Sequence, residues 1–235
     1  MNNLAGNLLE ELTVQYLTIP IGGYQLRISE SVVVTWIIMA VMLGLAIFLT
    51  WGLKVDNISR KQAIVELIVT KSEALVEDMI GEHGKQYAPY LVTILLYLGM
   101  SNLIDLFDMK LFGLSLKPPT KDLNVTAALA FMSIILIEYA GIHQKGVRGW
   151  LKSFAEPVAI IAPINFLEIF IRPLSLCMRL FGNILGAFVI MELLKMVVPV
   201  VLPAFFSCYF DIFDGLIQAY IFVFLTSMFI KEAVE

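Results

Sequence analysis

Arg179 is the side chain whose surroundings most directly suggest chemistry, because it lies within the long apolar stretch LSLCMRLFGNILGAFVIM. A charged group at the centre of a bilayer costs about 2.5–3.5 kcal/mol on insertion scales, so it usually faces the protein interior or a water path. Three and four positions away stand Ser175, Leu176, Gly182 and Asn183. None of these is acidic. Arginine does not usefully deprotonate, so Arg179 suits a fixed barrier to cations or an electrostatic latch for a passing carboxylate.

Polar residues form two stripes at helical spacing, with Ser175, Arg179 and Asn183 in one and Asp211, Asp214 and Gln218 in the other. Stripes on two facing helices would form a hydrated path with a fixed charge in it. One alternative is that Arg179 pairs with Asp211 or Asp214 within the chain. Another is that the polar residues only hydrogen-bond neighbouring helices together, which accounts for Asn183 and Gln218 but poorly for two carboxylates and an arginine.

The composition indicates a membrane protein. The chain has 235 residues, 59% of them apolar and 15% charged, with a mean hydropathy of +0.85. An ordinary soluble domain has about 45–50% apolar and about 25% charged residues. The net charge of −4 without a basic block argues against nucleic-acid binding. The first basic residue is Arg27, so no secretory signal peptide is expected.

We expect an all-α polytopic membrane protein with about five transmembrane helices, an amphipathic surface helix and a long, tilted C-terminal helical hairpin. A span needs about 20 apolar residues. A single membrane domain over 1–235 would comprise an outer segment over 1–31, spans over 32–52, 86–107, 123–142, 164–196 and 206–231, and an inner surface helix over 56–82. Pro199 and Pro203 are expected to separate the last two spans.

Basic residues predict the orientation. The loops over 54–85 and 143–152 contain eight lysines and arginines, whereas the segments on the opposite side contain four. The N-terminus is therefore expected outside the cell and the C-terminus in the cytoplasm. The expected location is the plasma membrane, as a multi-pass protein. The surface helix, with apolar residues at helical spacing between charges, would lie along the inner membrane surface or pack against the protein.

Four segments together identify a family resemblance: RPLSLCMRLFGNILG, SNLIDLFD, PPTKDLNVT and GLIQAYIFVFLTSMF. The first resembles the signature of subunit a, the ion-channel stator subunit of F-type ATP synthases, and the others follow in the family's order. The resemblance covers the chain from about residue 86 to its end, and the first 85 residues match in layout only.

The resemblance implies a rotary mechanism. Subunit a stands beside a ring of c subunits and offers two offset half-channels that each reach the middle of the membrane. An ion, a proton or a sodium ion, neutralises a ring carboxylate, rides nearly a full turn and leaves on the other side. The implied partners are the c-subunit ring, the b-subunit peripheral stalk, other ATP synthase subunits and the lipid bilayer. No cofactor, metal or catalytic residue is implied, and no GxxxxGK[ST] loop is present.

The resemblance also assigns residues. Arg179 matches the essential arginine that separates the half-channels. Asn183 and Gln218 match polar residues of the ion path, and Ser175 matches a position near the inner exit. Asn102 and Asp105 match polar residues of the outer access route.

The sequence departs from the family in its outer carboxylate. Many relatives carry a glutamate nine or ten residues after the essential arginine, where this chain has Phe188 and Val189. Glu192 stands 13 residues on, which places it on a different helix face. Some relatives carry a histidine seven residues before the matching glutamine, where this chain has Asp211. Our hypothesis is that Asp211, together with Asp214, supplies the missing carboxylate.

Two other functions compete with this interpretation. A secondary transporter could use the face around Arg179 to bind an anionic substrate, but no internal repeat is evident. An intramembrane hydrolase would need a nucleophile and a base within reach, and neither His83 nor His143 lies in a clear span.

Overall fold

A computed structural model of the chain describes residues 6, 13, 15–21, 24–54, 59–81, 84–104, 110–111, 114–115, 117–154, 159–197, 206 and 208–234. Its main helices are α2 (Glu30–Thr50), α3 (Arg60–Ile80), α4 (Ala88–Leu103), α5 (Leu123–Ser153), α6 (Ala162–Val197) and α8 (Gly215–Val234). Short helical turns are η1 (Gly84–Gln86), η3 (Pro119–Lys121), η4 (Ala159–Ile161) and the π-helical η5 (Cys208–Asp214). The predicted all-helical, polytopic class is confirmed.

Four helical stretches in the described part are long and apolar enough to cross a membrane: Glu30–Thr50, Leu123–Ser153, Ala162–Met196 and Ile212–Val234. A shorter apolar helix, α4, has 16 residues, or about 24 Å of helix. Backbone groups cannot bond to water inside a bilayer, so helices are the structure that these apolar stretches must adopt.

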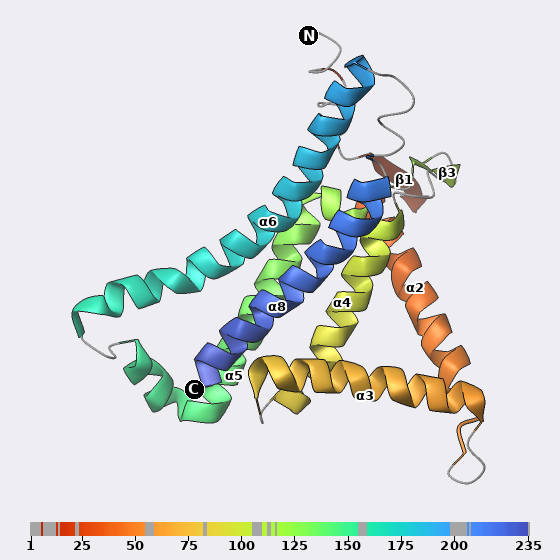
Figure 1. Cartoon of the computed structure of the whole chain (residues 1–235). Coiled ribbons are helices and arrows are strands. Elements are labelled where there is room, and N and C mark those ends of the chain that lie inside the picture. The colour runs from red at the N-terminus through yellow and green to blue at the C-terminus, as the bar shows by residue number, and fades with distance from the viewer. Residues whose placement is uncertain are drawn as a thin grey trace.

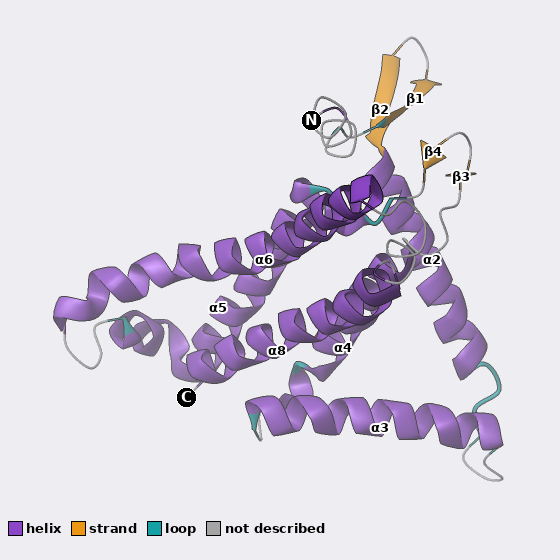
Figure 2. Cartoon of the chain, turned by 45° about the horizontal axis from the view of Figure 1, so that its top comes forward, coloured by secondary structure: helices purple, strands orange, loops and turns teal. Residues whose placement is uncertain are grey.

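The helices run between two ends of the molecule (Figure 1). One end carries the strands β1 and β3, and we call it the β1 end. The other carries α3, which lies across the bundle, and the C-terminal end of α8; we call it the α3 end. Helices α6 and α8 both run between these ends and are antiparallel, with α6 strongly tilted (Figures 1 and 2).

A single apolar core joins α3, α4, α5, α6 and α8, with Leu91, Leu98, Ile137, Leu180 and Phe222 fully buried within it. Helix α3 contributes Val76, Met79 and Ile80 from its last turns. Its first half instead exposes Ile64, Leu67 and Ile68. This division matches an amphipathic helix that lies on a surface with one end packed against the protein.

The segment over 143–152, expected as a loop, is helical except at one residue. Gly146 has φ 69° and ψ 163° inside α5, a conformation that glycine adopts without steric cost. Beyond this break, the Trp150 Nε1–H donates a 2.7 Å hydrogen bond to Glu138 Oε2. The carboxylate of Glu138 therefore has a partner on the other side of the break in α5.

Two small antiparallel hairpins were not predicted. Strand β1 (Tyr16–Ile21) pairs with β2 (Tyr24–Ser29), which leads directly into α2, and β3 (Lys110–Leu111) pairs with β4 (Leu114–Ser115). The sequence signal for the first hairpin is a Gly-Gly pair between two runs of β-branched and aromatic residues. Pro199 and Pro203, expected to separate the last two spans, lie outside the described residues.

Candidate functional site

The two predicted polar stripes meet at one contact between α6 and α8. Asn183 Nδ2 donates a 2.6 Å hydrogen bond to Gln218 Oε1. The Gln218 side chain is buried, and its Nε2 group has no hydrogen-bond partner in the part of the chain that the structure describes. A buried amide nitrogen without a partner is unfavourable, so this group marks a place where water or a passing ligand would be bound.

A second polar contact joins α4 to the start of α8. Asn102 Nδ2 donates to the Gly215 carbonyl at 2.8 Å, and Asn102 Oδ1 accepts from Thr120 Oγ1 at 2.9 Å. All three residues are buried. Gly215 precedes Gln218 by three residues, so the two polar contacts lie about one turn apart on α8; we call the groups in them, from Thr120 to Asn183, the polar series.

Sequence reasoning missed Thr120 in this series, although it lies in the quoted segment PPTKDLNVT. The hydrogen bond from Thr120 to Asn102 spans 18 residues, and no periodic pattern connects a residue in a 3₁₀ turn to a helix so far away. The other predicted member, Asp105, lies outside the described residues.

Gly215 is required by close packing, which gives a testable prediction. A Cβ atom at this position would lie 2.9 Å from Asn102 Cβ, and that atom cannot move without its backbone. We expect Gly215→Ala to destabilise the detergent-solubilised protein by about 1–3 kcal/mol, measured by thermal unfolding. Gly44→Ala is the matched control, because nothing lies within 4 Å of a Cβ at Gly44. Equal stability of the two variants would contradict the packing argument.

A pocket of about 280 Å³ lies at the β1 end, beside this polar series. Buried carboxylates line it, from Glu30 at the start of α2 and from Asp122, which caps α5. Lys117 and Lys121 also line it, and Phe181 contributes from α6. The pocket therefore reaches from the connection before α5 to a residue only two positions from Arg179.

Arg179 lies on α6 one turn before Asn183, and its side chain is half-buried. No described residue forms a hydrogen bond or an ion pair with it. The alternative pairing with Asp214 is absent, although Asp214 is described and half-buried. The backbone of Asp211 lies in η5, and its side chain is outside the described part. Ser175, one turn before Arg179, is exposed.

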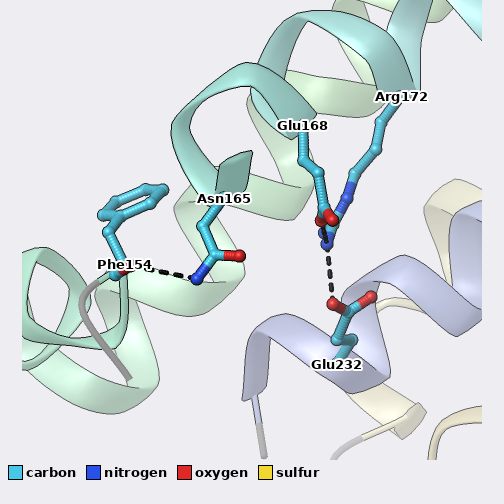
Figure 3. A network of polar contacts seen from close by, with 5 residues as sticks. All are labelled: Phe154, Asn165, Glu168, Arg172 and Glu232. Carbon is cyan, nitrogen blue, oxygen red and sulfur yellow. Dashed lines mark hydrogen bonds and ion pairs between the residues drawn. The ribbon is translucent and has the colours of Figure 1, made fainter. Parts of the chain in front are cut away.

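The other charged groups of α6 have partners. Arg172 Nη2 contacts Glu168 Oε2 at 2.6 Å and Glu232 Oε1 of α8 at 2.7 Å (Figure 3). The first contact has the favourable i,i+4 order, with the glutamate before the arginine, and the second links the two helices. Lys195 Nζ contacts Glu192 Oε1 at 2.7 Å, and Glu192 is buried.

Further contacts fix the α3 end of α6. Asn165 Nδ2 donates a 2.9 Å hydrogen bond to the carbonyl of Phe154, the residue that ends α5 (Figure 3). Within the described ranges, no group of three His, Cys, Asp or Glu side chains could hold a metal ion. The described part of the site thus combines contacts between uncharged polar groups with a half-buried arginine that has no partner there.

Comparison with known proteins identifies the family. Residues 32–231 match the family model described as ATP synthase A chain. The chain is 35% identical over 209 residues to ATP synthase subunit a of Moorella thermoacetica, covering 88% of this chain and 92% of that protein. It is 37% identical to ATP synthase subunit a 2 of a Bradyrhizobium strain, covering 88% and 89%.

A third relative carries a different printed specificity. It is the sodium ion specific ATP synthase subunit a of Propionigenium modestum, 32% identical over 224 residues, with 91% of this chain and 76% of that protein covered. The matches extend over nearly the whole sequence, including all the elements that carry the polar series and Arg179. The chain therefore belongs to the ATP synthase subunit a family, whose members are part of the ion-translocating membrane sector of that complex.

Proposed function

We propose that this chain forms two offset half-channels, separated by Arg179, that carry protons or sodium ions to and from carboxylates on a c-subunit ring. The observation that carries this proposal is that Arg179 is a charged, half-buried side chain in an apolar helix with no partner among the described residues. A charge at this depth requires water or an opposite charge. A ring carboxylate passing α6 would supply that charge.

The outer half-channel would begin at the β1 end. The pocket lined by Glu30 and Asp122 provides a polar mouth, and Thr120 and Asn102 lead from it to α8. Gln218 and Asn183 then lead to α6, one turn from Arg179. Asp211 and Asp214 precede this point on the chain and would provide the carboxylates that relay the ion.

The inner half-channel would open toward the α3 end. Ser175 is exposed on α6 on the opposite side of Arg179 from Asn183. The two routes then approach Arg179 from opposite directions along the same helix. Because a fixed positive charge repels cations and cannot release a proton, ions could pass from one route to the other only on the rotating ring.

The remaining assignments follow from this mechanism. The chain itself would catalyse no bond chemistry, and ATP turnover would belong to soluble subunits of the complex. The b-subunit stalk would hold it stationary against the c-ring. We assign the chain to the plasma membrane. The basic loops indicate that the β1 end lies outside and the C-terminus lies in the cytoplasm.

Sided labelling of single cysteines tests the two routes. In complexes assembled with the c-ring, Asp214→Cys should react with a membrane-impermeant, thiolate-specific reagent applied from outside, and Ser175→Cys with the same reagent applied from inside. Thiolates form only where water reaches the side chain. Leu174→Cys is the matched control, because Leu174 is next to Ser175 and is also exposed on α6 but is apolar and off the polar stripe.

We expect at least about tenfold faster labelling from the predicted side than from the other, since a thiolate facing lipid is strongly disfavoured. Leu174→Cys should remain unreactive from both sides. Labelling of both test positions from the same side would contradict the two-route arrangement. So would reaction of Leu174→Cys at the rate of Ser175→Cys.

A further inference from the structure

Two polar contacts hold the antiparallel pair α6 and α8 together, one on each side of Arg179. Asn183 contacts Gln218 toward the β1 end, and Arg172 contacts Glu232 toward the α3 end. Arg172 and Arg179 are seven residues apart, about two helical turns, so they share a face of α6. The second contact therefore fixes the same face of the helix that presents Arg179.

Between these contacts, the described part of α8 has no carboxylate that could form an ion pair with Arg179. From Ala219 to Ile230 it has no charged residue, and Phe222, Val223 and Thr226 are buried. The position of the guanidinium group is thus determined by how α6 itself is held, not by a bond to the guanidinium within the described part of α8.

Helix α6 depends on few contacts for that purpose. In the apolar 18-residue window of α6 that could span a membrane, 17% of the residues are buried within the chain, against 44% in the corresponding window of α5. Pro173 lies inside α6 directly after Arg172, and a proline in a helix removes one backbone hydrogen bond and favours bending. The helix is therefore weakest one and a half turns before Arg179, at the place where Arg172 is attached to α8.

Arg172 is well suited to brace this point. Its side chain is 16% exposed and contacts a carboxylate from each helix, Glu168 and Glu232 (Figure 3). Its guanidinium also lies 5.0 Å from the centre of the Phe229 ring, on the same face of α8 as Glu232. Glu168 belongs to the same helix as Arg172, so among these contacts of Arg172 those with Glu232 and Phe229 join α6 to α8.

We propose that Arg172 and Glu232 form an inner clasp that positions Arg179 between the two half-channels. The clasp prevents α6 from bending at Pro173, and so keeps the guanidinium group where it separates the two routes. Arg172 and Glu232 are positioning residues in this scheme and do not touch the ion. The inference rests on the proposed function of Arg179.

The test compares Glu232→Gln with Glu168→Gln. Both substitutions remove a carboxylate charge that contacts the same arginine, at side chains that are 41% exposed in Glu168 and 60% exposed in Glu232, but only the first removes a contact between the helices. We expect Glu232→Gln to raise passive ion leak through the membrane sector about fivefold, the scale of an accessible ion pair, and Glu168→Gln to leave it within about twofold. Leak is measured in vesicles from which the soluble part of the complex has been removed. An equal rise in both variants, or none in Glu232→Gln, would overturn the clasp.

Repeating the comparison with Arg179→Ala separates positioning from general loosening. If the clasp acts through Arg179, Glu232→Gln adds no further leak in that background, because the group it positions is gone. An additional fivefold rise would overturn the positioning role. Arg172→Lys gives a second variant that keeps the charge but loses the planar group that bridges two carboxylates, and we expect an intermediate leak.

The same experiment distinguishes a failure of the clasp from a failure of the proposed function. If Arg179→Ala leaks and Glu232→Gln does not, only the clasp is wrong and the proposed function stands. If Arg179→Ala itself neither leaks nor loses pumping, the proposed function and the clasp both fall.

Discussion

ATP-driven ion pumping is expected to fall by a hundredfold or more in inverted vesicles that carry the complex with Arg179→Ala, on the order of the loss seen when a preorganised charged group is removed from a functional site. The physical reason is that the alanine variant has neither the barrier between the two routes nor the cation that draws the ion off a ring carboxylate. Pumping is measured by quenching of a pH-sensitive dye, or by uptake of labelled sodium if sodium is the ion.

The variant should nevertheless assemble. Removing one partner of a buried ion pair is strongly destabilising, because it leaves an uncompensated charge. Arg179 has no such partner in the described part of this chain, so its removal leaves no carboxylate of these helices unpaired. Normal amounts of complex in the membrane, measured by immunoblotting of the neighbouring subunits, are therefore part of the expected result.

Lys195→Ala is the matched control. Lys195 is a cation on the same helix, half-exposed and paired with Glu192. Its loss should leave pumping nearly unchanged in the assembled complex, since Lys195 is half-exposed and hydrated and is far along α6 from Arg179. Unimpaired pumping in Arg179→Ala would mean that the arginine is structural. An equal loss in both variants would mean that any cation on α6 has the same effect, which also contradicts a specific barrier.

The helical architecture could be predicted because the bilayer leaves little choice. Apolar runs such as that over 32–51 must satisfy their backbone groups internally and so become helices. The β1–β2 hairpin has no such constraint. Its two strands have six residues each, and only the second alternates between apolar and polar residues, so the pattern is weak. The break at Gly146 depends on Trp150 returning to Glu138, a contact that spacing along the chain does not reveal.

The site could be predicted where its residues share one helix. Helical spacing placed Arg179 and Asn183 in one stripe and Gln218 in another; the pairing of Asn183 with Gln218 through a 2.6 Å hydrogen bond is seen in the structure. Contacts between distant segments, such as Arg172 with Glu232, were not predictable, because many carboxylates could have satisfied that arginine. The π-helical turn Cys208–Asp214 also changes the relation of Asp211 to Asp214. Spacing arguments assume 3.6 residues per turn, and a π-helical turn contains more.

The carboxylate of the proposed outer half-channel can be tested by substitution. On α6, the positions nine and ten residues after Arg179 are Phe188 and Val189. Glu192 is buried and paired with Lys195, so its charge already has a partner. In the proposed mechanism, Asp211 and Asp214, which precede Gln218 on the chain, supply the carboxylates of the outer half-channel. We therefore expect Asp211→Asn to slow ion uptake from outside by about a hundredfold or more, the usual contribution of a positioned proton-transfer group.

The measurement is the rate of ATP synthesis after an imposed ion gradient, with the amount of assembled complex determined in parallel. Asp211→Glu, which keeps a carboxylate, should retain most of the rate, and Asp214→Asn should slow it less if Asp211 is the main relay. Glu192→Gln is the control, because its partner Lys195 is half-exposed and remains hydrated. Full activity of Asp211→Asn together with a large loss in Glu192→Gln would assign the relay to α6 instead. In that case the outer route would reach Arg179 along its own helix, as in relatives with the usual glutamate, and the acidic residues before α8 would have another role.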